Sequence, residues 1–323
     1  MAILKRTLSG TLGKNLIDID FTTRQVVDSE EHSLLMELRN SSLNNEEAAQ
    51  ALFQRIVQSL SIEGHYVILL AYDTYDVPYR SKDGEQQEDA SSEVYSYFLC
   101  SICPVKMTKP ALSYYVNENM FHNRKEDWIV AAPEIGFLFP AFEDRSTNIY
   151  SALYYTRDIA ENHQEFVDAV FHCEVPMPAA EQKETFESIL GETLAEDCSY
   201  DVVQSVHGQL SGMIEEHKAN KEVEPLVLSK TAVKRVLESC GVPEERTATF
   251  DEKYDTVFGA DTELRPRNII NSKQFEVCTP DVTIRVNPER SDLLETRVID
   301  GKKYILIRAE EGVEVNGVQI HIS

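Results

Sequence analysis

The sequence lacks any long hydrophobic run. No apolar stretch approaches the roughly 18 to 20 residues that a helix needs to cross a bilayer, and the first residues, MAILKRTLSG, do not contain the continuous apolar core of a secretory signal. These absences argue against an integral membrane protein. The sequence therefore predicts a cytoplasmic protein that makes no contact with membranes.

Basic residues are scarce. The chain has 31 Lys and Arg residues against 55 Asp and Glu residues, which gives a formal net charge of -24. A surface this acidic repels the phosphate backbone of nucleic acids and anionic lipid headgroups at long range. We therefore expect a protein partner rather than direct contact with nucleic acid, although one local basic face would still permit such contact.

Cysteine is also sparse, and its six residues are spread along the chain rather than concentrated in a disulfide framework. Cys100 and Cys103, in the stretch YFLCSICPVKM, have the spacing of a metal or redox motif. A zinc site would need two more ligands at a matching spacing, and none follows. Because residues three apart on a strand point to opposite faces, we expect both thiols to be buried as small apolar side chains.

Familiar catalytic motifs are absent. The sequence has no Gly-x-Ser-x-Gly, no His-Glu-x-x-His, no dinucleotide-binding glycine set and no kinase signature. We expect neither a resident metal nor an organic cofactor. If the chain is an enzyme, its catalytic residues must be sought among isolated polar side chains.

Length and composition indicate a folded protein with more than one part. With 323 residues, of which 42% are hydrophobic and 27% charged, the chain can bury a substantial core and divide into domains. Acidic residues concentrate between 158 and 267, where 24 Asp and Glu stand against 10 Lys and Arg; from 268 to the end the numbers are 9 and 7. This distribution predicts three domains: 1–157, an acidic segment 158–267, and 268–323.

The first segment has the pattern of helices on a sheet. Apolar residues at three- and four-residue spacing predict a helix from Glu46 to Leu60, and a shorter one is expected at Glu30–Leu38. Short connections favour antiparallel pairing, so the predicted fold class is α+β with an N-terminal mixed or antiparallel sheet. Runs rich in β-branched and aromatic residues predict strands at 66–72, 94–102, 128–132, 137–142 and 149–155.

The remainder of the chain changes period. Between 158 and 267, apolar residues recur at the helical spacing and predict acidic amphipathic helices, one of which is capped by Ser229 and ended by Gly241. From 268 onward, strand-like runs are separated by Asp300-Gly301 and Asn316-Gly317, which are typical of two-residue hairpin turns. The chain should therefore end in a small antiparallel β-domain.

Four polar residues are candidates for chemistry. Asp73 and Asp76 lie in AYDTYDVP, where carboxylates leave a predicted strand, a common location for a Mg²⁺ ligand or a general base. Asp144 and Arg145 follow the apolar run GFLFPAF, and a guanidinium there is able to hold a phosphate or carboxylate through two parallel hydrogen bonds. Turn formation and corner pairing explain the same residues without a function.

Long strings of the sequence resemble a known family. LSGTLGKNL, ILLAYDTYDVPYRSKDG, YFLCSICPVKMTKPALSY and TPDVTIRVNPERSDLLETRVIDGKKYILI look like a bacterial family known as a domain of unknown function, DUF4317, and the resemblance runs from about Leu8 to the C-terminus. It implies no activity and no catalytic residues. Members usually carry some tens of residues before the position that matches Leu8, which implies that this chain is a shortened form. More distantly, the layout around FVDAVFHCEVPMPAAEQKETF is similar to that of the nucleoid-associated thirty-seven-kilodalton proteins.

The sequence as a whole favours a cytosolic, non-enzymatic protein that works by binding, either to another protein or within a nucleoid-associated assembly. Tyrosines at the predicted sheet edges would supply contact surface, although some would belong to the core; they are Tyr72, Tyr75, Tyr79, Tyr95, Tyr97, Tyr114 and Tyr115. The alternative is a metal-assisted hydrolase or phosphate-handling enzyme that uses Asp73, Asp76, Asp144 and Arg145. The enzyme hypothesis requires these four side chains to meet in one cleft.

Overall fold

The computed structural model divides into two compact units. One contains Met1–Glu181 with Val223–Pro225, and the other contains Gln182–Glu222 with Leu226–Ser323. The three-domain division stays a prediction. The described residues are 3, 4, 7, 13, 15–80, 86–143, 145–161, 163–220, 222, 224–272, 274–309, 312–315 and 317–321, with backbone alone described for 79, 80 and 86–92.

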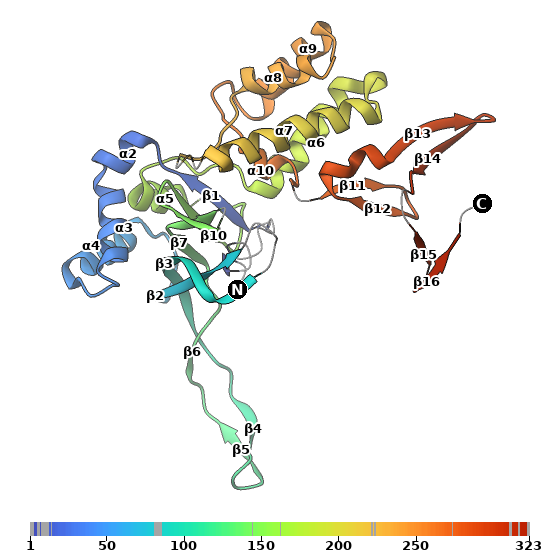
Figure 1. The fold of residues 1–323 in the computed structure, drawn as a ribbon. Helices are drawn as coiled ribbons and strands as arrows, with labels where there is room; N and C mark the ends of the chain where they lie inside the picture. Colours follow the sequence, from blue (N-terminus) through green and yellow to red (C-terminus); the bar gives the residue numbers. More distant parts are fainter. Residues whose placement is uncertain are drawn as a thin grey trace. The chain divides into compact units, whose positions relative to one another are not determined.

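The first unit is built on an antiparallel sheet with the strand order β1-β10-β7-β3-β2, and β6 pairs with the end of β3 (Figure 1). Every pairing in it is antiparallel, as the short connections predict. Its strands are β1 (Leu16–Asp20), β2 (His65–Arg80), β3 (Gln86–Met107), β6 (Trp128–Val130), β7 (Ile135–Phe139) and β10 (Ser151–Thr156).

Helices pack on one face of this sheet. Side-chain caps start three of them: Thr22 Oγ1 accepts from the Gln25 amide, Ser29 from His32, and Asn45 from Ala48. Leu52 and Ile56 from the predicted apolar stripe are buried in this core, together with Phe98 of β3. The helices are α2 (Thr23–Asp28), α3 (Glu30–Asn40), α4 (Glu46–Ser59) and α5 (Gln164–Phe171).

The opposite face of the sheet buries a second, smaller cluster. Tyr95 and Tyr97 of β3 stack with ring centroids 4.8 Å apart, and the Tyr95 hydroxyl donates a hydrogen bond of 2.6 Å to the Pro140 carbonyl. Because that hydroxyl has a partner, the ring can be buried completely. Ile3 packs against the same cluster, so both faces of β3 are covered.

Two short hairpins complete the first unit. One consists of β4 (Ala111–Tyr115) and β5 (Met120–Arg124), and the other of β8 (Ala141–Glu143) and β9 (Ser146–Asn148). The first hairpin projects away from the sheet of its own unit (Figure 1). It is absent from the elements predicted by the sequence.

The second unit begins with the helices expected from the acidic segment. The apolar stripes are buried as predicted, with Phe186, Leu210 and Leu237 at most 2% exposed. The Ser229 hydroxyl caps α8 by accepting from the Ala232 amide, which confirms that helix start. The helices are α6 (Ala179–Leu194, whose first residues belong to the first unit), α7 (Tyr200–Asn220), α8 (Lys230–Ser239), α9 (Glu244–Val257) and α10 (Pro266–Ile269).

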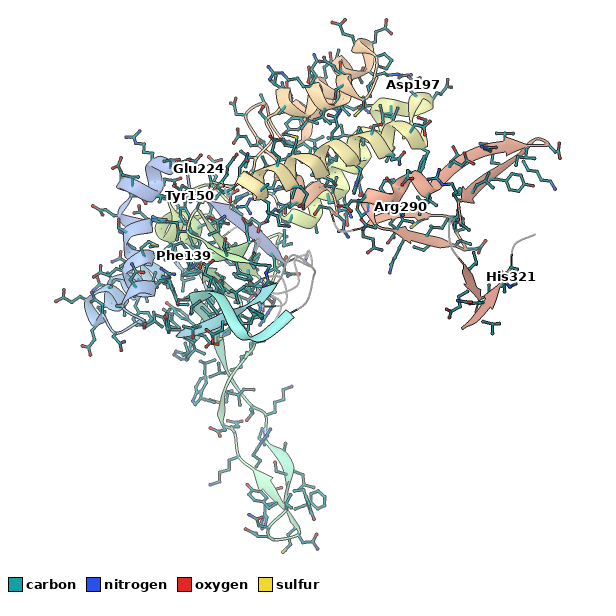
Figure 2. The ribbon with its side chains drawn as sticks, in the orientation of Figure 1. Phe139, Tyr150, Asp197, Glu224, Arg290 and His321 are labelled. Atoms are coloured by element: carbon teal, nitrogen blue, oxygen red, sulfur yellow. The ribbon has the colours of Figure 1, made fainter. Side chains whose placement is uncertain are left out.

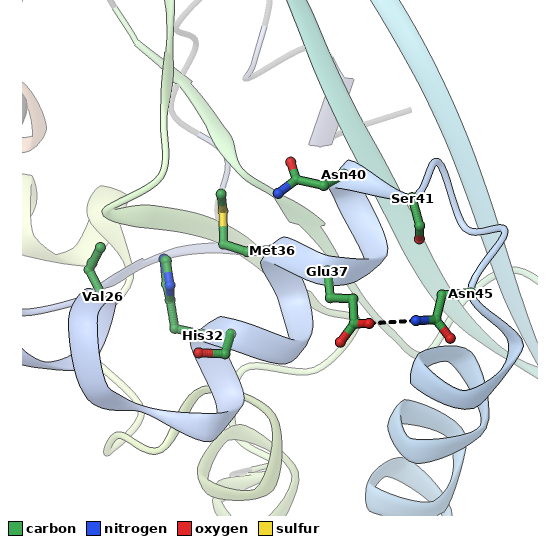
Figure 3. Close-up of a pocket in the computed structure, with 8 residues that line it drawn as sticks. Val26, His32, Met36, Glu37, Asn40, Ser41 and Asn45 are labelled. Carbon is green, nitrogen blue, oxygen red and sulfur yellow. Dashed lines mark hydrogen bonds between the residues drawn. The ribbon is translucent and has the colours of Figure 1, made fainter.

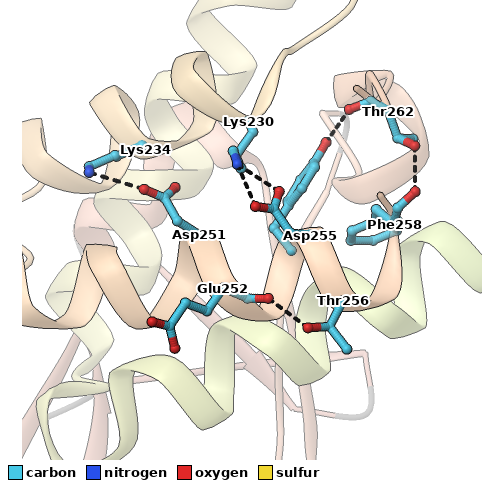
Figure 4. A network of polar contacts seen from close by, with 9 residues as sticks. Lys230, Lys234, Asp251, Glu252, Asp255, Thr256, Phe258 and Thr262 are labelled. Atoms are coloured by element: carbon cyan, nitrogen blue, oxygen red, sulfur yellow. Dashed lines mark hydrogen bonds and ion pairs between the residues drawn. The ribbon is translucent and has the colours of Figure 1, made fainter. Parts of the chain in front are cut away.

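Ion pairs join α8 to α9. Lys230 Nζ lies 2.6 and 2.8 Å from the two carboxylate oxygens of Asp255, and Lys234 Nζ lies 3.0 Å from Asp251 (Figure 4). Exposed pairs of this kind contribute little, about 0 to 1 kcal/mol each. Their arrangement directs two carboxylates of α9 toward α8 and neutralises part of the charge of this segment.

The C-terminal strands form three separate hairpins, each a two-stranded sheet. The predicted Asp300-Gly301 turn is confirmed by the φ angles of 51° and 77° that these residues adopt between β13 and β14. The hairpins are β11 (Phe275–Cys278) with β12 (Thr283–Val286), β13 (Leu294–Ile299) with β14 (Lys302–Ile307), and β15 (Val313–Val315) with β16 (Val318–Ile320). The fold class is therefore α+β, as predicted.

Membrane-spanning helices are a separate question. Across the residues described above, no helix has both the length and the apolar character needed to cross a bilayer.

Two glycines offer a matched test of this fold. A Cβ atom on Gly136 of β7 would lie 2.8 Å from the Cys100 carbonyl oxygen, so we expect G136A to lower the free energy of unfolding of the first unit by about 1 to 3 kcal/mol. The same substitution at Gly208, inside α7 with no atom within 4 Å, should raise that of the second unit by about 0.4 to 1 kcal/mol. Native-state hydrogen exchange resolves the two units. A G136A protein of undiminished stability would contradict the close approach of β7 to β3.

Candidate functional site

The two candidate acids of strand β2 point away from each other. Asp73 and Asp76 are three residues apart in a stretch that pairs regularly with β3, so their side chains lie on opposite faces of the strand. Both residues are exposed. Asp73 accepts hydrogen bonds from the Tyr97 hydroxyl (3.3 Å) and from the Thr74 amide (2.8 Å). The structure does not join these two carboxylates as a pair.

Arg145 is held by the main chain of strand β2. It adopts a φ of 68° in the turn between β8 and β9, and its Nη2 atom donates a hydrogen bond to the Pro78 carbonyl. The guanidinium thus reaches the end of β2, two residues beyond Asp76. Asp144 lies outside the described residues, so the assignment of Asp144 and Arg145 to ligand binding stays a prediction.

The two closely spaced cysteines have the predicted buried positions. Cys100 joins the helix-covered core and Cys103 is 4% exposed, and both are free thiols. Burial raises the pKa of each thiol, so neither is poised as a thiolate ligand or nucleophile. Among the residues that the structure describes, no group of three or more His, Cys, Asp or Glu side chains gathers as a metal site requires.

A hollow of about 610 Å³ opens beside helix α3. His32, Met36 and Glu37 line it together with residues of the α3–α4 connection (Figure 3). Its two ionisable side chains already have partners within the protein: His32 Nε2 donates to the Ile149 carbonyl (2.8 Å), and Glu37 accepts from the Asn45 amide group. This hollow therefore has the features of a packed helix junction rather than of a reactive site.

The tyrosines predicted at sheet edges differ in how far they are exposed. Tyr95 and Tyr97 belong to the core, as was expected for part of this set, because the second core cluster covers their face of β3. Tyr75, Tyr114 and Tyr115 are exposed as predicted, and Tyr72 is half-buried. The side chain of Tyr79 lies outside the described residues. Two of the three exposed rings belong to the projecting hairpin.

That hairpin, which we call the β-arm and define as residues 108–127, is the most distinctive surface of the first unit. Its base is closed by the Thr108 amide, which donates to the Asp127 carbonyl (2.8 Å), and by the Asp127 amide, which donates to the Thr108 hydroxyl (3.0 Å). Below the base, β6 pairs with the last residues of β3. The β-arm therefore follows directly on β3, with only residues 108–110 between β3 and β4.

Both faces of the β-arm carry large apolar side chains. Residues directly opposite each other share a face, so the pairs Leu112↔Asn123 and Tyr114↔Phe121 form one side, here called the Leu112 face. Leu112 is 65% exposed and Phe121 is 63% exposed. Tyr115 and Met120 form the other side and are also exposed. Figure 2 shows side chains projecting from both sides of the β-arm.

Charge separates along the β-arm. Glu118 at its tip is the only Asp, Glu, Lys or Arg residue between Lys109 and Arg124. Lys109, Arg124 and Lys125 lie at the stem, where a hollow of about 690 Å³ is lined by Leu112, Arg124 and Lys125 among others. Within the β-arm, Glu118 contacts His122 Nε2 at 2.8 Å.

Sequence reasoning missed the β-arm although a signal was present. The strings ALSYY and MFHNR are short β-prone runs on either side of the polar turn VNEN. The turn is not one of the two-residue Gly-containing types that mark a tight hairpin. The exposed tyrosines were identified by residue type, and their common element was not.

Comparisons with known proteins give one match. A family model described as a domain of unknown function, DUF4317, matches residues 1–318. A search of curated proteins finds no match to the chain. The similarity to nucleoid-associated proteins suggested by the sequence layout therefore gains no support.

The buried imidazole beside the α3 hollow makes the first unit sensitive to acid. Burial lowers the pKa of His32, whose ring packs edge-on against Phe21 at 4.9 Å. The unfolded chain binds a proton near pH 6.5 that the folded form resists, so stability is complete above that pH and falls as the pH drops below it. We expect α3 amides to exchange faster at pH 5 than at pH 7.5, once rates are corrected for intrinsic exchange.

Two variants control this expectation. H32Q should reduce the pH dependence of α3 exchange even if it lowers overall stability. H207Q changes a half-buried imidazole that lies in the other unit and whose pKa is also lowered by burial, and it should leave α3 unaffected. If the pH dependence of α3 amide exchange is unchanged in H32Q, the His32 imidazole is not its cause.

Proposed function

The chain belongs to the DUF4317 family, and we propose that it is a non-catalytic binding protein whose β-arm holds a protein partner. The observation that carries this proposal is the exposure of large apolar side chains on both faces of a projecting two-stranded ribbon. An isolated two-stranded ribbon is marginally stable in water. Side chains such as Leu112 and Phe121 gain stability if a partner covers them.

The composition of the β-arm suits contact with protein. Tyrosine, phenylalanine, methionine and arginine are the residues enriched at protein interfaces, and Tyr114, Met120, Phe121 and Arg124 supply one of each. Tyrosine adds a polar end to a large apolar ring. The free edges of β4 and β5 also present main-chain groups on which another strand can pair.

A protein partner is favoured over nucleic acid. The β-arm has three Lys or Arg residues and three Asp or Glu residues, so it offers no excess of positive charge to a phosphate backbone. On α9, Asp251 and Asp255 add negative charge where a recognition helix would need the opposite sign. If the chain works within a nucleoid-associated assembly, we propose that it contacts a protein member of that assembly.

The alternative of a metal-assisted hydrolase or phosphate-handling enzyme has weaker support. Its candidate acids Asp73 and Asp76 project from opposite faces of β2, and the Arg145 guanidinium is bonded to a main-chain carbonyl. General acid–base or metal chemistry requires its groups to converge on one reacting atom. The β-arm is therefore the surface that we propose to be functional.

A site-specific crosslink tests the proposal. A photoreactive residue at Val116, 77% exposed at the tip of the β-arm, should form adducts with protein in native lysate. The same residue at Val298, 70% exposed on β13, is the matched control and should form none. The double variant Y114S/F121S should reduce adducts at position 116 by about tenfold or more, because hot-spot aromatic residues contribute about 2 kcal/mol or more each.

The variants must remain folded for this test to count. Exposed substitutions of this kind change stability by about 0.5 kcal/mol or less, so unfolding curves of the double variant should overlay those of the wild type. Equal capture at positions 116 and 298, or capture that survives Y114S/F121S, would contradict the proposal.

A further inference from the structure

We propose that the protein partner of the β-arm is the β-arm of a second copy of this chain, held in an antiparallel two-fold arrangement. This inference rests on the proposed function and names the partner of the same surface. In a two-fold interface each subunit contributes the same patch, so the patch must be complementary to itself. The β-arm has this property in its charge and in its apolar face.

The charge complementarity runs from tip to stem. Glu118 stands alone at the tip, whereas Arg124 and Lys125 lie together at the stem. When two β-arms lie antiparallel, the tip of each is beside the stem of the other, so Glu118 of one copy meets Lys125 of its partner. Arg124 pairs with Ala111 on the side away from Leu112, so its long side chain joins this contact around the edge of the ribbon. Two acids, Glu126 and Asp127, also lie at the stem, and the Asp127 carboxylate accepts a hydrogen bond from the Trp128 amide (2.8 Å). With Lys109, Arg124 and Lys125, the stem keeps more cations than anions.

The apolar complementarity comes from the Leu112 face. Tyr114 and Phe121 lie side by side on it, with ring centroids 5.1 Å apart, and Leu112 extends the surface toward the stem. When this face packs on its own copy, two aromatic rings and a leucine from each chain are withdrawn from water. Aromatic side chains prefer such offset or edge-to-face contacts with one another.

The distribution of charge over the whole chain favours contact between two copies at the β-arm. Residues 108–127 contain three Lys or Arg and three Asp or Glu, so the β-arm is neutral and the remainder of the chain carries the net charge of -24. Two such bodies repel each other. A neutral ribbon that projects from its own unit allows contact between copies without bringing the sheet or helices of the two first units together.

The expected dimer is weak and reversible. Two aromatic rings bury about 150 to 250 Å² each, so the Leu112 face falls short of the roughly 800 Å² per partner of a stable interface. We therefore expect association that rises with protein concentration in the micromolar range.

Reversing the charges at the tip or at the stem of the β-arm tests the proposed dimer, whose formation by the full-length chain is measured by sedimentation velocity. E118K and the double variant R124E/K125E each place like charges at the contact, and each should weaken dimerisation by about tenfold or more, as close interfacial charge pairs do. An equimolar mixture of these two variants should form a mixed dimer. The triple variant E118K/R124E/K125E should recover wild-type dimerisation, because opposite charges again face each other.

The control is K302E/K303E, which makes the same change in net charge as R124E/K125E on the β13–β14 hairpin. It should dimerise like the wild type. F121S should dimerise poorly, since it removes an aromatic ring from the Leu112 face without changing charge.

Several outcomes overturn the inference. A wild-type protein that stays monomeric across the micromolar range, or a triple variant that does not recover dimerisation, excludes the second copy as partner. If position 116 then captures a different protein, the proposed function stands and only this inference fails. If the monomer instead shifts duplex DNA in a salt-dependent way that Y114S/F121S abolishes, nucleic acid is the partner and both proposals fail.

Discussion

The pairing of strand β3 with both β2 and β7 is the interaction on which the first unit depends. Alternate residues of β3 enter different cores: Phe98, Cys100 and Ile102 meet the helices, whereas Tyr95 and Tyr97 meet the second cluster. A slip of one residue would exchange the two sets and place hydroxyl groups in the helix-covered core. The same strand continues past this region to pair with β6, so the register of the sheet also determines where the β-arm begins.

The parts of the fold that follow from local rules were predictable from the sequence. The Glu46 helix, the Ser229 cap and the Asp300-Gly301 turn each depend on residues within a few positions of one another, and the structure contains all three. The burial of the tyrosines could not be predicted from their neighbours in the sequence. Tyr95 and Tyr114 have similar strand-like surroundings in the sequence, but only Tyr95 is covered by a cluster that includes a residue as distant as Ile3.

The candidate site shows how one geometric rule applies twice. The three-residue spacing that separates Cys100 from Cys103 on opposite faces also separates Asp73 from Asp76, so the weakness of the acid pair was already present in the sequence. The β-arm was harder to recognise, because its two short β-prone runs flank a turn that lacks the Gly-containing signature of a tight hairpin. The β-arm stands out because it projects from the sheet and leaves its apolar side chains exposed. Both features depend on how the whole first unit folds.

The continuity of β3 into the β-arm has a mechanical consequence. A force applied at the tip by a bound partner is transmitted along β3, parallel to the strand and perpendicular to its hydrogen bonds with β2 and β7. Bonds loaded in this shearing direction share the load and must break together, whereas bonds at the end of a peeled hairpin break one by one. We therefore expect the β-arm to be anchored through the hydrogen bonds that β3 shares with β2 and β7.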